Sequence, residues 1–125
     1  MDTSHHSGGA VPSLDLALAD TIEKFLMARY DMRRPPIAAA RLLAVIVLLD
    51  EQKQPFPSRR RVAEEIRCSV YGIDAALQVA MARGLISQHV EIAQGNVQRR
   101  ESILRNRYYV PSDELRALRG RRRAA

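Results

Sequence analysis

The sequence predicts a mainly α-helical domain with a small β-hairpin, an α+β fold. Apolar residues recur at helical spacing through most of the first 83 positions, which favours amphipathic helices. Two later segments rich in strand-forming residues flank a Gly95-Asn96 turn signal, which favours a hairpin. A chain of 125 residues fits one domain that buries a core of its own.

The amino-acid composition is that of an ordinary globular protein. Of the residues, 46% are hydrophobic and 27% are charged. The single cysteine, Cys68, fits a reducing compartment. Neither a secretory signal nor an apolar run of the ~20 residues that a membrane span needs is visible, so we expect a cytoplasmic protein that does not bind a membrane. His5, His6 and His89 lack metal-ligand spacing, and no nucleophile–base pair or phosphate loop occurs. We therefore expect no metal, no cofactor and no enzymatic activity.

The amino-terminal part of the chain contains one predicted helix. Residues 1–12 are rich in Ser, Gly and His, and we expect them to be disordered. A helix follows within residues 13–34, with Ser13 as its N-cap and an end near Tyr30. Its apolar positions form one stripe, which consists of Leu14, Leu18, Ile22, Phe25, Leu26 and Tyr30.

The second predicted helix, roughly Pro36 to Glu51, is apolar on nearly all sides. Such a helix must be covered around most of its circumference. Either it is the central rod of the domain, or a second subunit covers part of it, and the sequence leaves both alternatives open. Gln52 to Pro57 is predicted to be a turn with room for at most a short strand.

Two helices joined by a tight turn are predicted between Pro57 and Ile86. Ser58 is the expected N-cap of the first, Arg59 to about Arg67, and Ser69 caps the second, about Val70 to Arg83. The second of these helices should pack inward through its apolar positions, Ile73, Ala76, Leu77 and Ala80.

The last third of the chain predicts the hairpin and a short helix. Gly84 should end the preceding helix in the left-handed conformation. The strands are expected within Ile86 to Gln94 and Ser102 to Val110, with a long tip between them. Residues 112–125 are predicted to form a short helix that is capped by Ser112, followed by a loose basic tail.

The net positive charge lies in the second half of the chain. Residues 1–55 hold six Lys and Arg against seven Asp and Glu, whereas residues 56–125 hold fourteen against seven. A positive field concentrated on part of a small domain attracts polyanions and supplies affinity that does not depend on base sequence. The alternative is a generic basic surface that keeps the protein in solution.

The first candidate contacts lie in the pair of helices. Arg59, Arg60 and Arg61 occupy a first helical turn, where cations oppose the helix dipole. Phosphate oxygens facing this helix end would offset the repulsion, and a solvated, salt-bridged helix end is the alternative.

The second of the two helices would face the bases. Its expected outward positions are Ser69, Tyr71, Gly72, Asp74, Ala75 and Gln78. Because no Arg or Lys precedes Arg83, we expect weak base discrimination, with Gln78 reading adenine and Tyr71 touching phosphate or a thymine methyl group. Packing of this helix on a protein partner is the alternative.

The hairpin carries the remaining candidates. Arg99 and Arg100 lie at its tip and are expected to enter a minor groove. Arg105 and Arg107 should share one strand face and contact phosphates, although a solvated hairpin is the simpler alternative.

Residues 36–110 resemble the MarR-type transcription regulators. PIAAARLLAVIVLLDEQ is similar to the helix before that family's short first strand, and PSRRRVAEEIRCS to its proline- or threonine-led helix with an apolar-alanine pair, here Val62-Ala63. The run from Ser69 to Gly84-Leu85 has the length of the family's next helix. The resemblance implies a winged helix-turn-helix domain over residues 35–111, with an N-terminal helical extension, in a homodimeric regulator that binds double-stranded DNA.

Two features differ from the family pattern. Only about fifteen residues follow Val110, where the family has long dimerising helices, and GNVQRRES replaces its Asp-Gly-Arg wing tip. We therefore expect dimerisation through the helix in residues 13–34, with some contribution from the apolar second helix. Many family members bind small anionic aromatic ligands, but the sequence identifies no small-molecule effector here. A winged-helix protein–protein adaptor without specific DNA binding is the main alternative function, and RNA binding through the basic RGRRR tail is a third.

Overall fold

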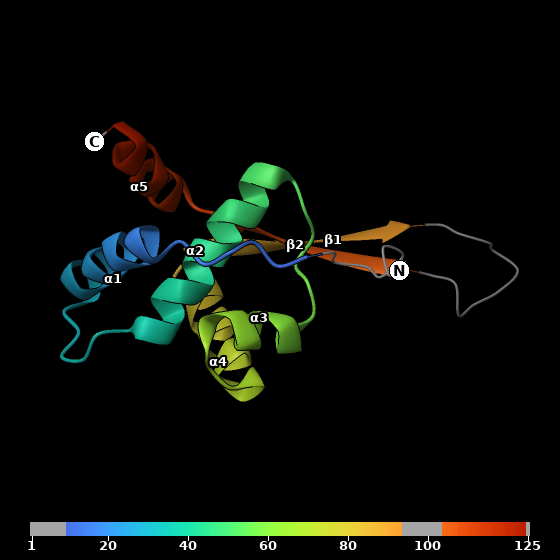
Figure 1. Cartoon of the computed structure of the whole chain (residues 1–125), viewed down its shortest axis with the longest axis horizontal. Helices are drawn as coiled ribbons and strands as arrows, with labels where there is room; N and C mark the ends of the chain where they lie inside the picture. Colours follow the sequence, from blue (N-terminus) through green and yellow to red (C-terminus); the bar gives the residue numbers. More distant parts are fainter. Residues whose placement is uncertain (1–9, 94–103, 125) are drawn as a thin grey trace, which may run out of the picture.

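The computed structural model describes residues 10–93 and 104–124. Within these ranges the elements are α1 (Leu16–Tyr30), α2 (Ile37–Gln52), α3 (Arg59–Ile66), α4 (Val70–Ala82), β1 (Ile86–Ala93), β2 (Leu104–Pro111) and α5 (Asp113–Ala124). The predicted fold class, mainly α with a small β-hairpin, is confirmed. Figure 1 shows the β1–β2 hairpin extending away from the helices, with α5 lying on the same side of the molecule as α1.

Helix α2 is the centre of the core. Every residue from Leu42 to Leu49 is buried, and α2 contacts α1, α3, α4, α5 and β2. The first of the two alternatives for this helix is therefore correct, because its own chain covers the apolar run. Arg41 interrupts the run and donates from Nη1 to the carbonyl oxygen of Ile66 at 3.3 Å. That contact places a cation at the C-terminal end of α3, where the helix dipole favours it.

Helix α1 packs its apolar stripe against α2. Leu18, Ile22 and Leu26 are buried, as the spacing predicts. The predicted N-cap Ser13 is wrong, because Asp15 caps the helix and accepts from the backbone N–H of Leu18 at 3.0 Å. A carboxylate satisfies the first turn and also interacts favourably with the positive end of the helix dipole.

Helices α3 and α4 begin at the predicted caps. The Ser58 hydroxyl accepts from the backbone N–H of Arg61 at 3.2 Å, and the Ser69 hydroxyl accepts from that of Gly72 at 2.9 Å. A Cβ added to Gly72 would lie 3.2 Å from the Ser69 hydroxyl oxygen, so glycine leaves room for this cap. The turn between the two helices starts at Arg67, which has a positive φ of 59°.

The hairpin is antiparallel, and its pairs run from Ile86 with Pro111 to Ala93 with Leu104. Gly84 enters it with φ of 73°, as predicted for a left-handed helix end. Instead of a short strand, residues 54–58 make one ladder-like contact, in which the backbone N–H of Phe56 donates to the carbonyl oxygen of Arg107 at 2.7 Å. The backbone N–H of Gln54, two residues earlier, donates to the carbonyl oxygen of Leu49 at 3.0 Å and is therefore not available to β2.

Helix α5 returns to the helical body. Ser112 caps it as predicted, accepting from the backbone N–H of Leu115 at 3.3 Å, and Leu115 and Leu118 are buried. The predicted end near Arg119 is wrong, since the helix continues to Ala124 and includes most of the expected loose tail. Arginine and alanine are good helix formers and offset the cost of the single Gly120.

Candidate nucleic-acid interface

The outer face of α4 is exposed, and Asp74 is its one charged residue. Its opposite face packs inward through Ile73, Leu77 and Ala80, which leaves a solvent-facing row that we name the neutral ridge. The neutral ridge consists of Tyr71, Ala75, Gln78 and Ala82, all of which are exposed. Tyr71 is the most prominent, with 84% of its surface accessible. The predicted outward positions are therefore exposed, apart from Gly72, which is half-buried beside its cap.

The structure pairs two of the predicted site residues with each other. Nε of Arg59, at the start of α3, donates to a carboxylate oxygen of Asp74 on α4. The two side chains are 40% and 52% exposed, so the pair contributes little to stability, ~1 kcal/mol at most. Its larger effect is electrostatic, because Asp74 is neutralised by Arg59 next to the neutral ridge.

Other cations surround the two helices. Arg60 and Arg61 project from the first turn of α3 and are exposed. Arg67, in the turn between α3 and α4, is exposed as well and was missed as a site residue in the sequence. Its position directly after the apolar face of α3 was the available signal, because a helix end followed by a capping serine is where the backbone turns toward solvent.

The hairpin register places the backbone positions of Arg105 and Arg107 two residues apart along β2. Arg105 is paired with Ile92 and Arg107 with Val90, two positions apart along β1. Arg99 and Arg100 lie outside the described residues, as does most of the predicted tip.

A recess of about 230 Å³ separates the hairpin from the start of α3. Ser58 and Arg59 border it on one side, and Val90 and Arg107 on the other. Nε of Arg107 is buried and has no hydrogen-bond partner among the described residues. An unpaired buried N–H is costly, and the guanidinium that carries it belongs to a residue that borders the recess.

Several arginines of the second half of the chain are neutralised by the first half. Arg116 donates two hydrogen bonds to Asp50, at 3.1 and 3.2 Å. Arg119 contacts Glu51 at 2.8 Å and Asp15 at 3.3 Å. The hydrogen bonds to Asp50 and Glu51 raise the pKa values of Arg116 and Arg119. These contacts anchor α5 to α1 and α2.

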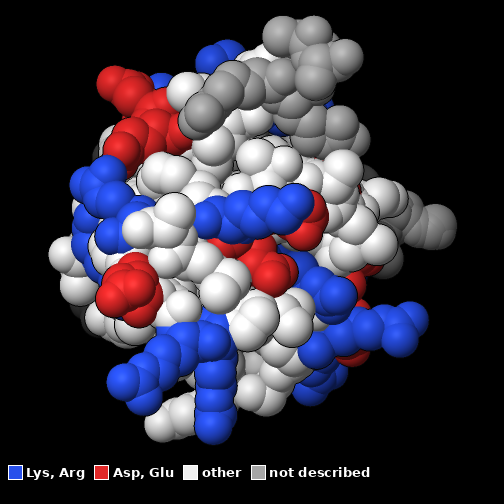
Figure 2. All heavy atoms as spheres, turned by 90° about the vertical axis from the view of Figure 1, so that its left-hand side faces the viewer, with Lys and Arg blue, Asp and Glu red and all other residues white. Residues whose placement is uncertain are grey.

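The surface charge therefore differs from the division seen along the sequence. On the face that carries α1 and α5, acidic groups lie beside basic ones at the centre, and basic side chains protrude at the lower edge (Figure 2). The arginines of α3 and of the turn after it, Arg60, Arg61 and Arg67, remain exposed. Among the described residues, Arg33 and Arg34 before α2 and Lys53 after it are exposed as well, so exposed positive charge is present around α3 and at both ends of α2.

Cys68 is a structural residue in the turn. It is half-buried, and its thiol donates to the carbonyl oxygen of Ser69 at 3.4 Å. Burial raises the pKa of the thiol, so the lowering of that pKa by Arg67 that a redox sensor would need is not observed.

The described residues contain no group of three His, Cys, Asp or Glu side chains that could hold a metal ion. None of the described helices is long and apolar enough to cross a membrane.

Comparison with known proteins adds no relative. No family model matches the chain, and neither a curated protein nor a solved structure matches it significantly. Function has to be inferred from the residues of this chain.

Proposed function

We propose that the chain is a DNA-binding transcription regulator with a winged helix-turn-helix of the MarR type. The observation that carries the proposal is the arrangement of α3, α4 and the hairpin. Two short helices joined by a tight turn are followed directly by a hairpin, and the segment before α3 is bonded to β2 through Phe56 and Arg107. This order of helix, short edge segment, two helices and two-stranded wing is that of winged-helix DNA readers.

In this reading α4 lies in the major groove with its neutral ridge toward the bases. Tyr71 and Gln78 can touch base edges or the thymine methyl group, and Ala75 and Ala82 allow close approach. The pair formed by Arg59 and Asp74 keeps a bare carboxylate away from the phosphates. Because the neutral ridge carries no cation, base discrimination is weak.

Most of the affinity then comes from the DNA backbone. Arg60, Arg61 and Arg67 flank α4 and are exposed. A phosphate oxygen in the recess would pair with Arg107 and lie near the positive end of α3. Arg99, Arg100 and Arg105 extend the same contacts along the wing, with the tip arginines in a minor groove. The backbone contacts make binding strongly dependent on salt.

The proposal includes a homodimer on a pseudo-palindromic site. The apolar stripe of α1 is used inside its own chain, so dimerisation falls to the outer face of α1, where Leu16 is 60% exposed. Sedimentation velocity should show a dimer for the native chain and a monomer for Leu16→Glu. A Leu16→Glu variant that remains dimeric would place the interface elsewhere.

A fluorescence anisotropy titration with random duplex DNA tests DNA binding. We expect the native chain to bind DNA with micromolar or tighter affinity at low salt. In a plot of the logarithm of the association constant against the logarithm of the salt concentration, each lost phosphate contact should reduce the steepness of the slope by about one unit. Arg60→Gln and Arg67→Gln should each weaken binding to all sequences. The matched control is Lys24→Gln on α1, which removes one exposed charge far along the chain from α3 and should leave the slope unchanged.

The same titration separates the adaptor alternative. Tyr71, Val70 at 44% exposure and Val79 at 47% exposure give α4 an apolar outer surface of the kind that protein partners bind. An adaptor would show no micromolar binding to duplex DNA even at low salt.

A further inference from the structure

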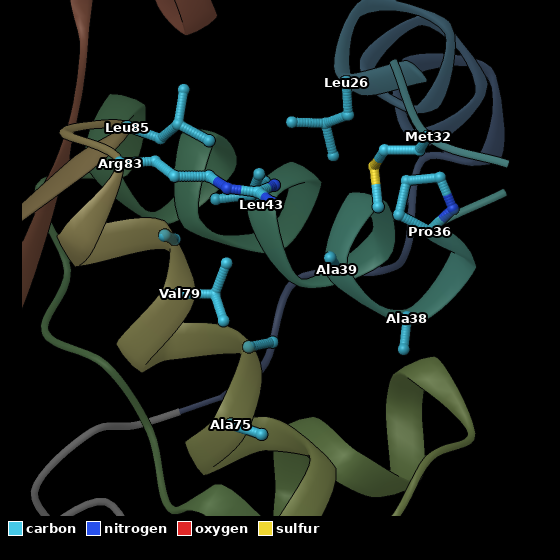
Figure 3. Close-up of a pocket in the computed structure, with 12 residues that line it drawn as sticks. Leu26, Met32, Pro36, Ala38, Ala39, Leu43, Ala75, Val79, Arg83 and Leu85 are labelled. Carbon is cyan, nitrogen blue, oxygen red and sulfur yellow. The ribbon is translucent and has the colours of Figure 1, made fainter. Parts of the chain in front are cut away.

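An apolar groove lies between α4, the first turns of α2 and the end of α1. Its volume is about 390 Å³, within the size range of small-molecule sites. Figure 3 shows Leu26 of α1 and Val79 of α4 pointing toward the groove from opposite sides, with Met32 and Pro36 on a third. It shares no lining residue with the recess beside Arg107, and it adjoins the neutral ridge at Ala75.

The lining of the groove favours a flexible aliphatic guest. Ala38 and Ala39 on α2 face Ala75 and Ala76 on α4, and these small side chains leave the space open. The remaining apolar walls are Ala80 and the Leu, Val, Met and Pro side chains, with no aromatic ring among the lining residues. A flat aromatic ligand would find no ring to stack on, whereas an acyl chain fills an irregular aliphatic wall that includes a flexible methionine.

The electrostatics of the groove favour a negative head group. Arg83 is the one charged residue in the lining. Its guanidinium carbon lies 4.0 Å from the centroid of the Tyr30 ring, which holds the cation across the gap between α4 and α1. A guanidinium that is stacked by its face still has N–H groups along its edge to donate to a carboxylate.

Helix α2 adds to the same field. Pro36, its N-cap, lines the groove and makes no side-chain cap hydrogen bond, so the positive end of a 16-residue helix borders the space without a carboxylate to offset it. No Asp or Glu belongs to the lining. The Arg83 cation and the N-terminus of α2 thus give the otherwise apolar groove a positive electrostatic potential.

We propose that this groove binds an unbranched aliphatic carboxylate. The hydrocarbon chain of the ligand lies between Leu26, Val79 and the alanines of α2. The carboxylate of the ligand accepts hydrogen bonds from the edge of the Arg83 guanidinium. The site belongs to a single chain and does not depend on DNA binding by α4. A bound ligand would nevertheless contact α4 through Val79, on the side of the helix next to its neutral ridge.

Isothermal titration with decanoate and with decanol, which has the same chain without the charge, tests the proposal. Decanoate should bind the native chain more tightly than decanol. Arg83→Gln should weaken decanoate binding by about tenfold, the size of one charge-assisted hydrogen bond, and leave decanol binding unchanged. Arg34→Gln, which removes an exposed arginine outside the lining, is the matched control and should bind both probes normally.

A second variant separates the groove from adventitious surface binding. Ala38 is exposed on the first turn of α2 and lines the groove, so Ala38→Phe fills the space without altering the core and should abolish binding of both probes. Equal affinity of native chain and Arg83→Gln for decanoate would overturn the assigned head-group contact. Undiminished binding to Ala38→Phe, or no decanoate binding to the native chain, would overturn the site.

Discussion

Arg59 at the start of α3 is paired with Asp74 in the second turn of α4, fifteen positions further along the chain. The pair joins the two helices that the proposed function assigns to DNA, and it cancels the one acidic charge on α4. Breaking the pair would therefore change the net charge of the surface that a polyanion would contact.

Asp74→Asn should therefore strengthen DNA binding. The substitution releases Arg59 from its ion pair and removes a negative charge next to the neutral ridge. We therefore expect the affinity for DNA to rise several-fold and to depend more steeply on salt concentration. Stability should fall by less than ~1 kcal/mol, because both side chains are substantially exposed. Asp20→Asn on α1 breaks a comparable exposed pair with Lys24 and should leave DNA affinity unchanged. Weaker binding by Asp74→Asn would contradict the proposed orientation of α4.

Arg119→Gln should destabilise the fold. The Arg119 side chain is 19% exposed and contacts Glu51 on α2 and Asp15 before α1, so its loss removes one cationic partner from each of two carboxylates. We expect the free energy of unfolding in urea to fall by about 1–2 kcal/mol. Arg29→Gln breaks the more exposed pair with Glu114 and should cost about half as much or less. Equal effects of the two substitutions would contradict the larger contribution expected from the less exposed contacts of Arg119.

Cys68 should make stability depend on pH in the alkaline range. Burial raises the pKa of its thiol in the folded state, so above the ordinary thiol pKa of about 8.5 the unfolded chain loses a proton that the native state keeps. The unfolded state then binds fewer protons, and the free energy of unfolding falls as pH rises toward the native pKa. Cys68→Ala should remove this component, which urea titrations between pH 7 and pH 10 would detect. An identical alkaline decline in both proteins would assign it to other groups.

Phe56→Ala should loosen the hairpin. The Phe56 ring packs edge-on against Tyr109 with centroids 5.1 Å apart, and its backbone N–H bonds β2. Because Phe56 is half-buried, we expect a loss of about 2 kcal/mol, below the range for fully buried phenylalanines. Hydrogen exchange should accelerate in β2 more than in α2. Phe56→Leu keeps most of the apolar area and should show a smaller effect in both measurements.

The sequence predicted most of the helix N-caps correctly. Ser58, Ser69 and Ser112 cap the helices predicted for them, because a side chain that accepts a backbone N–H two or three residues later acts within its own segment. The cap of α1 was misassigned because Ser13 and Asp15 are both competent capping residues two positions apart. Only the packing of the stripe on α2 fixes which of them starts the helix.

Contacts between distant segments were beyond such signals. The covering of α2, the pairing of Arg59 with Asp74 and the docking of α5 by Arg116 and Arg119 all depend on how helices approach one another. For the same reason, neither the groove beside Arg83 nor the recess beside Arg107 could be read from spacing.

The sequence by itself determined the types and order of the elements, the turn chemistry and the excess of positive charge in the second half of the chain, because periodicity, caps and composition are local properties. The tertiary structure decided which of those charges remain available. Acidic residues of the first half, Asp15, Asp50 and Glu51, take up Arg116 and Arg119 from α5, since electrostatic attraction depends on distance in space. Arg60 and Arg67, beside α4, stay exposed, as do Arg33 and Arg34 in the segment before α2.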